Sequence, residues 1–279
     1  MSKTRIAPTP SGFLHAGNAF NFLVTDRLAK GMGARLVLRI DDLDAERVRP
    51  EYVEDVFRSL EWLGVRVDEG PSGPQALHAS WSQQLRIPRY NVAVEQLRTA
   101  DALYPCSCSR THMEPLSRAG HDCRIRPMHN APRGTPWRLR IPEPGMVPVT
   151  ALDDQVEWMD LPSLMPDPVI VQRASERPAY QIASLVDDLE MGITFIVRGE
   201  DLRPSTACQA FMARILEKEA FGAIRFHHHP LLRDTDGAKL SKSAGSTSLR
   251  AMRESGQDPG ALISAAYRYV DTLALDLSL

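Results

Sequence analysis

The sequence lacks the features that mark several classes of protein. Its 279 residues contain no apolar run near the ~20 residues that a membrane-spanning helix needs. The first residues, 1–5, lead straight into strand-like sequence and have no apolar core of a signal peptide. Positive charge is not in excess either, because 33 Lys and Arg stand against 35 Asp and Glu, a net charge of −2. A protein that coats nucleic acid neutralises phosphates, so that class is disfavoured. We expect a cytoplasmic monomer without membrane contact.

Cysteine is also scarce. The four cysteines are Cys106, Cys108, Cys123 and Cys208. In an intracellular chain of this size, such residues are more often metal ligands or core residues than disulfide partners. Cys208 recurs at helical spacing with Phe211, Met212 and Ile215. This apolar stripe predicts that Cys208 is a core residue.

Strands and helices alternate in the first hundred residues. We expect strands at 5–7 and 35–40 and helices near 18–28, 51–63 and 90–100. The continuous apolar run of the second strand is typical of a parallel sheet that is buried on both faces. The order of these elements predicts an α/β fold with a doubly wound, Rossmann-like sheet.

The alternation stops between about 101 and 176, where cysteines, prolines and short apolar runs prevail. It returns with a helix near 180–188, a strand at 193–197 and a helix at 205–217. We therefore predict a nucleotide-binding domain in two halves, 1–100 and 177–245. An α+β subdomain, 101–176, is inserted between the halves. A short tail, 246–279, follows, with one helix near 259–270.

Two segments have the composition of phosphate-binding elements. In the first, a Pro- and Gly-rich loop joins a strand to the helix that starts near Asn18, with His15 one turn earlier. A helix N-terminus favours phosphate oxygens, and a histidine can add a donor. The alternative is a turn with a surface histidine.

The second segment, 239–243, contains Lys239 and Lys242 on a loop bracketed by two glycines. Two such lysines can stabilise charge on a leaving pyrophosphate. The alternative is a solvated basic loop.

These segments resemble the two signatures of class I aminoacyl-tRNA synthetases. His15-Ala16-Gly17-Asn18 is similar to the HIGH signature, and Lys239 to Ser243 is similar to KMSKS. Further segments in the expected order narrow the resemblance to the glutamyl group: 5–12, 38–44, 179–180, 196–202 and 229–230. The resemblance spans about residues 4 to 245 and implies the class I catalytic fold.

Enzymes of this family activate an amino acid with ATP and release pyrophosphate. The resemblance implies that His15, Gly17 and Asn18 hold the ATP phosphates. It implies that Lys242, helped by Lys239, stabilises the phosphate that is transferred, and that Mg²⁺ accompanies the ATP. Catalysis would then consist of positioning and electrostatics, without a covalent enzyme nucleophile.

The resemblance also implies a glutamate pocket that includes Ala7 and Thr9 of the first loop. Arg5 and Arg198 carry guanidinium groups, which suit the two carboxylates of glutamate. Tyr180 can donate a hydrogen bond to the amino acid. Thr9 stands where the family commonly has Ser, and it keeps the hydroxyl.

Two positions depart from the family. Asp41 stands where the family usually has the Glu that faces the ammonium group. Its shorter side chain places the carboxylate farther from the ammonium group. Either the loop moves Asp41 closer, or the preferred amino acid differs from glutamate. Alternatively, Asp41 caps the next helix. Asn18 replaces the last His of HIGH and can cap a helix itself.

The insert contains a candidate zinc site. Cys106, Cys108 and Cys123 supply soft thiolates, which suit a tetrahedral, structural Zn²⁺. Short members of the family that modify queuosine have a zinc site here. We expect His121 as the fourth ligand, with His112 or His129 as alternatives, or no fourth ligand at all.

The insert is also basic, and a histidine run lies near the end of the predicted domain. Residues 104–140 contain seven Arg and two acidic residues, a charge of +5. This surface is either a contact for RNA or a solvated Arg-rich loop.

The run at 227–229 is either a metal-binding tract or a wall of the active site, and its match to the family's His-Pro element favours the wall.

The short tail leaves no room for an anticodon-reading domain, so we expect no ordinary charging of tRNA. The resemblance then implies activation of glutamate with ATP and its transfer to the queuosine base of tRNA(Asp). One alternative is an amino-acid-activating ligase with a non-tRNA acceptor. An alternative of another class is an inactive paralogue that binds tRNA or glutamate.

Overall fold

The structure is a computed structural model that describes residues 1–108, 122–125, 131–173, 175–232 and 248–273. The chain forms two compact units. The first unit contains residues 1–85, 191–202 and 224–279, and the second contains 86–190 and 203–223. The functional division that we predict, with boundaries near 100 and 176, stays a prediction.

The first unit is built on parallel strands. They are β1 (Lys3–Ile6), β2 (Arg35–Leu38), β8 (Phe195–Gly199) and β9 (Arg225–His229). β1 pairs with β2, and β8 pairs with β9. The backbone N–H of Thr194, next to the start of β8, donates to the carbonyl of Lys3 over 2.8 Å. β1 and β8 therefore begin next to each other, and both strand pairs are parallel, as the sequence predicts.

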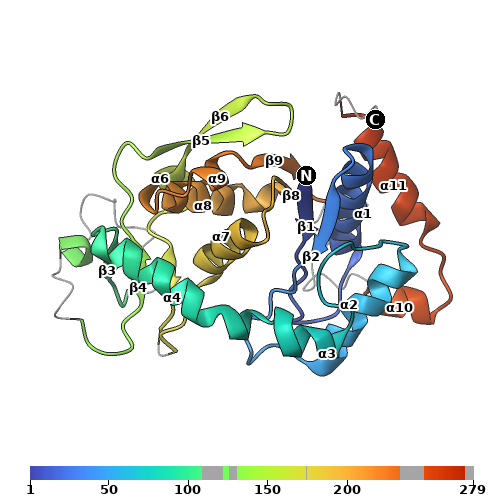
Figure 1. Ribbon diagram of the computed structural model, residues 1–279, viewed down its shortest axis with the longest axis horizontal. Coiled ribbons are helices and arrows are strands. Elements are labelled where there is room, and N and C mark those ends of the chain that lie inside the picture. Colours follow the sequence, from blue (N-terminus) through green and yellow to red (C-terminus); the bar gives the residue numbers. More distant parts are fainter. Residues whose placement is uncertain (109–121, 126–130, 174, 233–247, 274–279) are drawn as a thin grey trace. The chain divides into compact units, whose positions relative to one another are not determined.

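Helices cover this sheet. They are α1 (Ala16–Gly31), α2 (Pro50–Trp62), α3 (Pro74–Ala76), α10 (Leu249–Glu254) and α11 (Gly260–Asp271), with a π turn at Leu77–Trp81 and a 3-10 turn at Glu200–Leu202. Phe20, Leu23, Val24 and Leu28 of α1 recur at helical spacing and are buried, and α1 packs on β1 and α11 (Figure 1). Pro50 opens α2, where its missing N–H has no helical partner to lose. Gly64 follows α2 with a φ of 68°, a conformation that glycine adopts freely.

The second unit combines helices with short strands. Its helices are α4 (Gln83–Thr99), which begins in the first unit, α6 (Leu161–Leu164), α7 (Tyr180–Glu190), α8 (Arg203–Ile215) and α9 (Glu219–Gly222). Its strands are β3 (Leu103–Pro105), β4 (Trp137–Leu139), β5 (Met146–Ala151), β6 (Val156–Asp160) and β7 (Val169–Val171), and a 3-10 turn covers Asp122–Ile125. β3, β4 and β7 form an antiparallel sheet, and β5 and β6 form a hairpin.

Two buried features hold the second unit together. Arg86 of α4 donates through Nε and Nη2 to the carboxylate of Asp187 in α7, each over 2.8 Å, and the Tyr90 hydroxyl donates to the same carboxylate over 2.7 Å. Cys208 of α8 is fully buried, which confirms its predicted place in the core. The described elements between 101 and 176 have only three to six residues, as the broken pattern of the sequence predicts.

One boundary differs clearly from the prediction. α4 begins at Gln83 rather than near Tyr90, and it contains Pro88. A proline lacks a backbone N–H and usually ends a helix, so its presence hides the first turns from a reading of the sequence. In the described part of the chain, every helix is too short or too polar to cross a bilayer.

Candidate active site and candidate metal centre

The parallel strands and the loops after them carry several of the predicted site residues. In a parallel sheet these loops meet at the carboxyl edge, where open α/β folds bind ligands. Ala7–Thr9 follows β1, Asp41 follows β2, and Arg198 lies near the end of β8. The backbone N–H of Asp41 donates to the carbonyl of Pro8 over 2.9 Å, so the first two loops are joined. The first unit thus brings these predicted residues to one edge.

Two buried arginines stand on the neighbouring strands β1 and β8. Arg5 is 4% exposed and Arg198 is 2% exposed. The guanidinium of Arg198 lies 5.6 Å from the centre of the Phe226 ring. Buried guanidinium groups form strong, bidentate hydrogen bonds with carboxylates. The chemistry of this edge therefore suits an anionic ligand.

His15 caps α1 in a reciprocal arrangement. Its Nδ1 accepts the backbone N–H of Gly17 over 3.1 Å, and Oδ1 of Asn18 accepts the backbone N–H of His15 over 3.0 Å. Because Nδ1 is an acceptor, a neutral imidazole carries its proton on Nε2. The N-cap is therefore His15 rather than Asn18, and Asn18, at the third helical position, supplies the reciprocal half of the cap. Because the backbone N–H of Gly17 donates to His15 Nδ1, the group that can donate to a phosphate here is the Nε2–H of His15.

Asp41 forms an ion pair instead of capping a helix. Arg39 donates through Nε to Oδ1 over 2.7 Å and through Nη2 to Oδ2 over 3.1 Å. The Arg39 side chain is completely buried, and Asp41 is 7% exposed. Gln83 contributes a longer contact of 3.4 Å to Oδ1. The next α-helix begins only at Pro50, so the capping alternative for Asp41 is wrong.

The start of α4 braces the Asp41 loop, which the sequence reading missed. Ser82 Oγ and the backbone N–H of Gln83 donate to the carboxylate of Asp42, over 2.6 and 2.7 Å. Gln84 Nε2 donates to the carbonyls of Asp42 and Leu43, both over 2.8 Å. Ser is a common residue before a helix, so Ser82 signals the true start of α4. The partners of that helix start lie about forty positions away and leave no local signal.

Two histidines of the run contact different partners, and the predicted active-site wall stays a prediction. Asn21 Nδ2 contacts His229 Nε2 over 3.0 Å, and His229 Nδ1 contacts the carbonyl of the following residue over 2.9 Å. Burial lowers the pKa of His229, which favours the neutral ring. His227 Nε2 instead contacts the hydroxyl of Tyr269. The ring nitrogens thus face separate partners and do not converge.

The described residues on either side of 233–247 contact α1 and its N-cap. His229 contacts α1 before the loop, and after it Ser248 forms an antiparallel bridge with His15. Lys239 and Lys242 lie in 233–247, outside the described residues. Their predicted roles stay predictions. Tyr180 is the first residue of α7 in the second unit, and its bond to the amino acid also stays a prediction.

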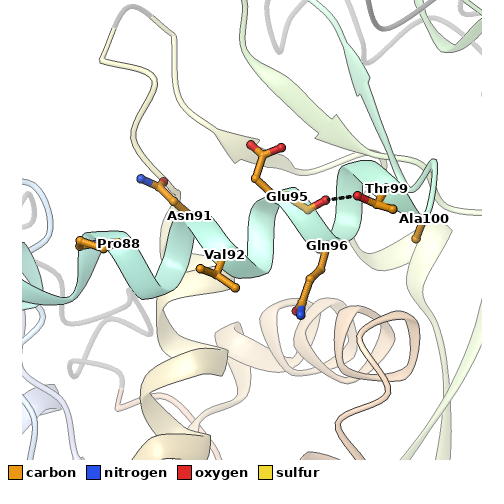
Figure 2. Close-up of a pocket in the computed structure, with 7 residues that line it drawn as sticks. All are labelled: Pro88, Asn91, Val92, Glu95, Gln96, Thr99 and Ala100. Carbon is orange, nitrogen blue, oxygen red and sulfur yellow. Dashed lines mark hydrogen bonds between the residues drawn. The ribbon is translucent and has the colours of Figure 1, made fainter.

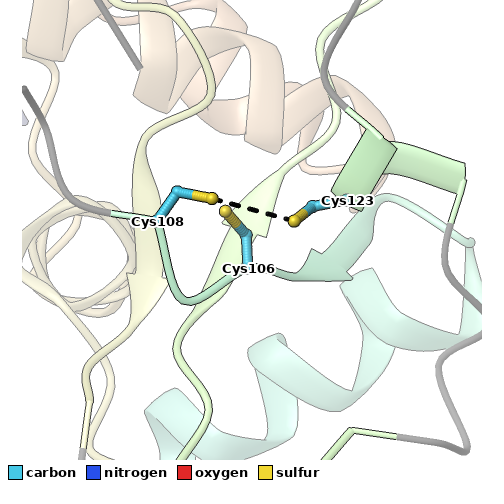
Figure 3. Close-up of side chains that lie close together, drawn as sticks. All are labelled: Cys106, Cys108 and Cys123. Atoms are coloured by element: carbon cyan, nitrogen blue, oxygen red, sulfur yellow. Dashed lines mark hydrogen bonds between the residues drawn. The ribbon is translucent and has the colours of Figure 1, made fainter. Parts of the chain in front are cut away.

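Three cysteines of the second unit converge. The sulfur atoms of Cys106, Cys108 and Cys123 lie within 4.8 Å of one another, and those of Cys108 and Cys123 are 3.9 Å apart (Figure 3). Zn–S bonds of about 2.3 Å at tetrahedral angles would separate the sulfur atoms by about 3.8 Å. The donor set and its spacing therefore fit Zn²⁺. His121, His112 and His129 all lie outside the described residues.

Burial makes the cysteine cluster an unfavourable place for thiolates alone. It raises the pKa of Cys123 to about 12, and the neighbouring thiols Cys106 and Cys108 add to this effect. A divalent cation would reverse that balance, because it binds the deprotonated thiolate. Metal binding at this cluster would thus release protons.

Polar side chains brace the cysteine cluster from one side. The Tyr104 hydroxyl donates to Asp167 Oδ2 over 2.8 Å. Arg138 donates to the carbonyls of Asp167 and Cys108, over 2.9 and 3.0 Å. Residues that orient the first ligands of a metal usually matter for its binding. Arg138 thus serves the interior of the insert.

Fewer arginines of the insert are available for contact with RNA than its composition suggests. Arg138 is buried, Arg124 donates to the carbonyl of Ile141, and Arg140 donates to the carbonyl of Arg124. The side chain of Arg133, in contrast, is 94% exposed. The other three arginines of the seven lie outside the described residues. Part of the predicted charge of +5 is therefore internal structure.

An open hollow runs along α4 in the second unit (Figure 2). It is lined by Pro88, Asn91, Val92, Glu95, Gln96, Thr99 and Ala100. Six of the seven residues come from this one helix and Ala100 directly follows it, and none is a predicted site residue. The hollow offers no converging polar groups from a second element, so it does not compete with the strand edge as the candidate active site.

Comparison with known proteins agrees with this geometry. Residues 1–272 match the family of class I tRNA synthetases (E and Q), catalytic domain. The chain is 38% identical to glutamate–tRNA ligase 2 of Acidiphilium cryptum, over 95% of this chain and 60% of that protein. It is also 38% identical to glutamyl-Q tRNA(Asp) synthetase of Parasynechococcus marenigrum, over 93% of this chain and 80% of that protein.

The solved structures include a similar fold. A glutamate tRNA ligase from Elizabethkingia meningosepticum, solved in complex with its amino acid, superposes with a TM-score of 0.71 and 27% identity. The match covers 95% of this chain and 60% of that one. The chain thus spans about three-fifths of the length of the glutamate ligases that it matches.

Proposed function

The chain belongs to the class I tRNA synthetases (E and Q) through their catalytic domain, and on that premise we propose that it activates glutamate with ATP and transfers it to the queuosine base of tRNA(Asp). The observation that carries the activation step is the set of polar side chains on β1, on β8 and on the loop after β2, which a backbone hydrogen bond from Asp41 to Pro8 joins to the loop after β1. Buried Arg5 and Arg198 and the oriented carboxylate of Asp41 come from these segments.

The charges at this edge match those of glutamate. Arg5 and Arg198 suit its two carboxylates, and Asp41 suits its ammonium group. Ala7 and Thr9 would complete the pocket, and the family resemblance assigns Tyr180 a hydrogen bond to the amino acid. The Arg39 contact orients Asp41 and does not exclude a further donor, because a carboxylate offers about four acceptor positions.

The proposed reaction needs no covalent enzyme nucleophile. An oxygen of the glutamate α-carboxylate forms a bond to the α-phosphorus of ATP, and the bond from that phosphorus to pyrophosphate breaks. His15, at the start of α1, would donate its Nε2–H group to the phosphates, while the Gly17 N–H fixes the ring and Asn18 holds the backbone of His15. Lys239 and Lys242 would neutralise the leaving pyrophosphate, with Mg²⁺ bound to the nucleotide.

The names of the relatives and the contents of the insert support queuosine-containing tRNA(Asp) as the acceptor. The relative of which this chain spans 80% is named a glutamyl-Q tRNA(Asp) synthetase, whereas the chain spans 60% of the relative named glutamate–tRNA ligase 2. Zn²⁺ held by Cys106, Cys108 and Cys123 would cross-link the insert. Exposed Arg133 could then contact RNA phosphates.

Two measurements test the proposal. ATP–pyrophosphate exchange is measured with each of the twenty amino acids, with and without tRNA. Transfer of radiolabelled glutamate is then measured on tRNA(Asp) with queuosine and on the same tRNA without it. We expect exchange with glutamate without any requirement for tRNA, and transfer only to the queuosine-containing tRNA.

The other outcomes identify the competing functions. Transfer to tRNA that lacks queuosine would indicate an ordinary glutamate–tRNA ligase. Exchange without transfer to either tRNA would favour a ligase with a non-tRNA acceptor. No exchange with any amino acid would favour an inactive, binding paralogue and refute the activation step.

A further inference from the structure

The ion pair between Arg39 and Asp41 does more than neutralise a buried charge. Arg39 contacts both oxygens of the carboxylate, through two nitrogens of one planar group. A planar fork of this kind fixes the rotation of a carboxylate, whereas a lysine ammonium makes a point contact. The Arg39 side chain is completely buried, so it has little freedom to move away.

The backbone around the pair is fixed as well. The N–H of Arg39 donates to the carbonyl of Ile6 over 3.0 Å, and the N–H of Asp41 donates to that of Pro8 over 2.9 Å. Gln83 Oε1 accepts the backbone N–H of Leu43 over 3.0 Å. The Asp41 carboxylate is therefore held on the β1 loop by its backbone and in one orientation by Arg39.

We propose that Arg39 is a positioning residue for amino-acid selection, because it holds the Asp41 carboxylate in the orientation that receives the substrate's ammonium group. This inference rests on the proposed activation of glutamate. It adds that the shorter acid at position 41 works because Arg39 orients it. The ligand class selected is an amino acid with a free ammonium group, as opposed to the corresponding dicarboxylate.

The test compares glutamate with glutarate, which is the same dicarboxylate without the ammonium group. Both are measured as ligands of the full chain in ATP–pyrophosphate exchange, glutamate by its KM and glutarate by its inhibition constant. The ratio of these constants reports the ammonium contact alone. General loss of folded protein lowers the rate but leaves this ratio unchanged.

The variants are Arg39→Lys and a matched control, Arg86→Lys. Arg86 makes the same two-nitrogen contact with a buried Asp187, but in the second unit. We expect Arg39→Lys to raise the KM for glutamate about tenfold, to leave glutarate inhibition unchanged, and to change the KM for ATP less than twofold. This corresponds to the loss of one well-oriented charged contact. Arg86→Lys lowers thermal stability and leaves the ratio unchanged.

Further variants keep the test decisive if Arg39→Lys fails to fold. Asp41→Asn keeps the size of the side chain and should remove the preference for glutamate over glutarate. Gln83→Ala removes the contact at 3.4 Å and should raise the KM for glutamate two- to threefold.

An unchanged ratio in Arg39→Lys would overturn the inference. If Arg39→Lys does not fold, an unchanged ratio in both Asp41→Asn and Gln83→Ala would overturn it. In either case, glutamate-dependent exchange by the wild-type chain would still support the proposed activation of glutamate. A wild-type chain without glutamate-dependent exchange would overturn both.

Discussion

The cap of α1 allows the two roles of His15 to be separated by substitution. His15→Ala removes both the Nδ1 acceptor of the cap and the Nε2–H donor. His15→Asn keeps an acceptor for the helix, because Asn is among the best N-cap residues, but removes the imidazole donor. Asn18→Ala removes only the reciprocal half of the cap, the 3.0 Å contact with the His15 backbone.

The expected magnitudes differ for the two roles. Loss of a cap costs about 1 kcal/mol, which lowers the melting temperature of a chain of this size by about 2–4 °C. Loss of one donor to the reacting phosphates costs about a hundredfold in rate, or about 2.7 kcal/mol. We expect His15→Ala to show both losses, His15→Asn to show only the loss of rate, and Asn18→Ala to show mainly the loss of stability.

Thermal melting and ATP–pyrophosphate exchange on the same preparations measure these effects. Exchange is measured at saturating glutamate, so that the rate reports the phosphate contact. If His15→Asn kept the wild-type exchange rate, the assignment of the Nε2 donor to ATP would be refuted. If Asn18→Ala lost as much activity as His15→Ala at equal stability, the cap and the chemistry could not be separated as we argue.

Three further predictions concern the rest of the molecule. Cys108→Ser should lower the zinc content measured by atomic absorption, whereas Cys208→Ala, in the core of α8, should leave the zinc content unchanged; equal zinc in both would refute the metal centre. Burial lowers the pKa of His229 below 6.5, so the unfolded chain binds a proton before the folded chain does as the pH falls through 6.5, and stability is lost in that window. His229→Asn should therefore reduce the difference in melting temperature between pH 7.5 and pH 5.5, whereas His78→Asn, at an exposed position, should leave that difference unchanged. Tyr104→Phe should cost about 1–3 kcal/mol in urea unfolding, because a buried carboxylate loses a donor, and an unchanged midpoint would contradict this.

The fold was predictable where side-chain periodicity decides the structure. The apolar face of α1 and the regular apolar spacing of α2 depend on neighbours three and four positions away, which the sequence displays directly. The strand β2 was predictable from its continuous apolar run. The start of α4 was missed because Pro88 outweighed Ser82 in the local pattern.

The site was predictable in its residue types and not in its contacts. The resemblance named Asp41, but its contact with Gln83 joins positions about forty residues apart. Likewise, the charge of the insert is a sum over residues, and a sum cannot show that Arg138 and Arg124 donate to backbone carbonyls of the same unit. Such partners depend on how distant segments pack.

One contact at the site did have a local signal. In an extended segment, side chains two positions apart lie on the same side, so an acid two positions after an arginine can pair with it. Arg39 has Asp41 at this spacing, and the two form the buried ion pair. Arg5 has Ala7 at the same spacing, which offers no charge. The spacing therefore predicts an acidic partner within its own segment for Arg39 and none at position 7 for Arg5, and the structure contains the Arg39–Asp41 pair.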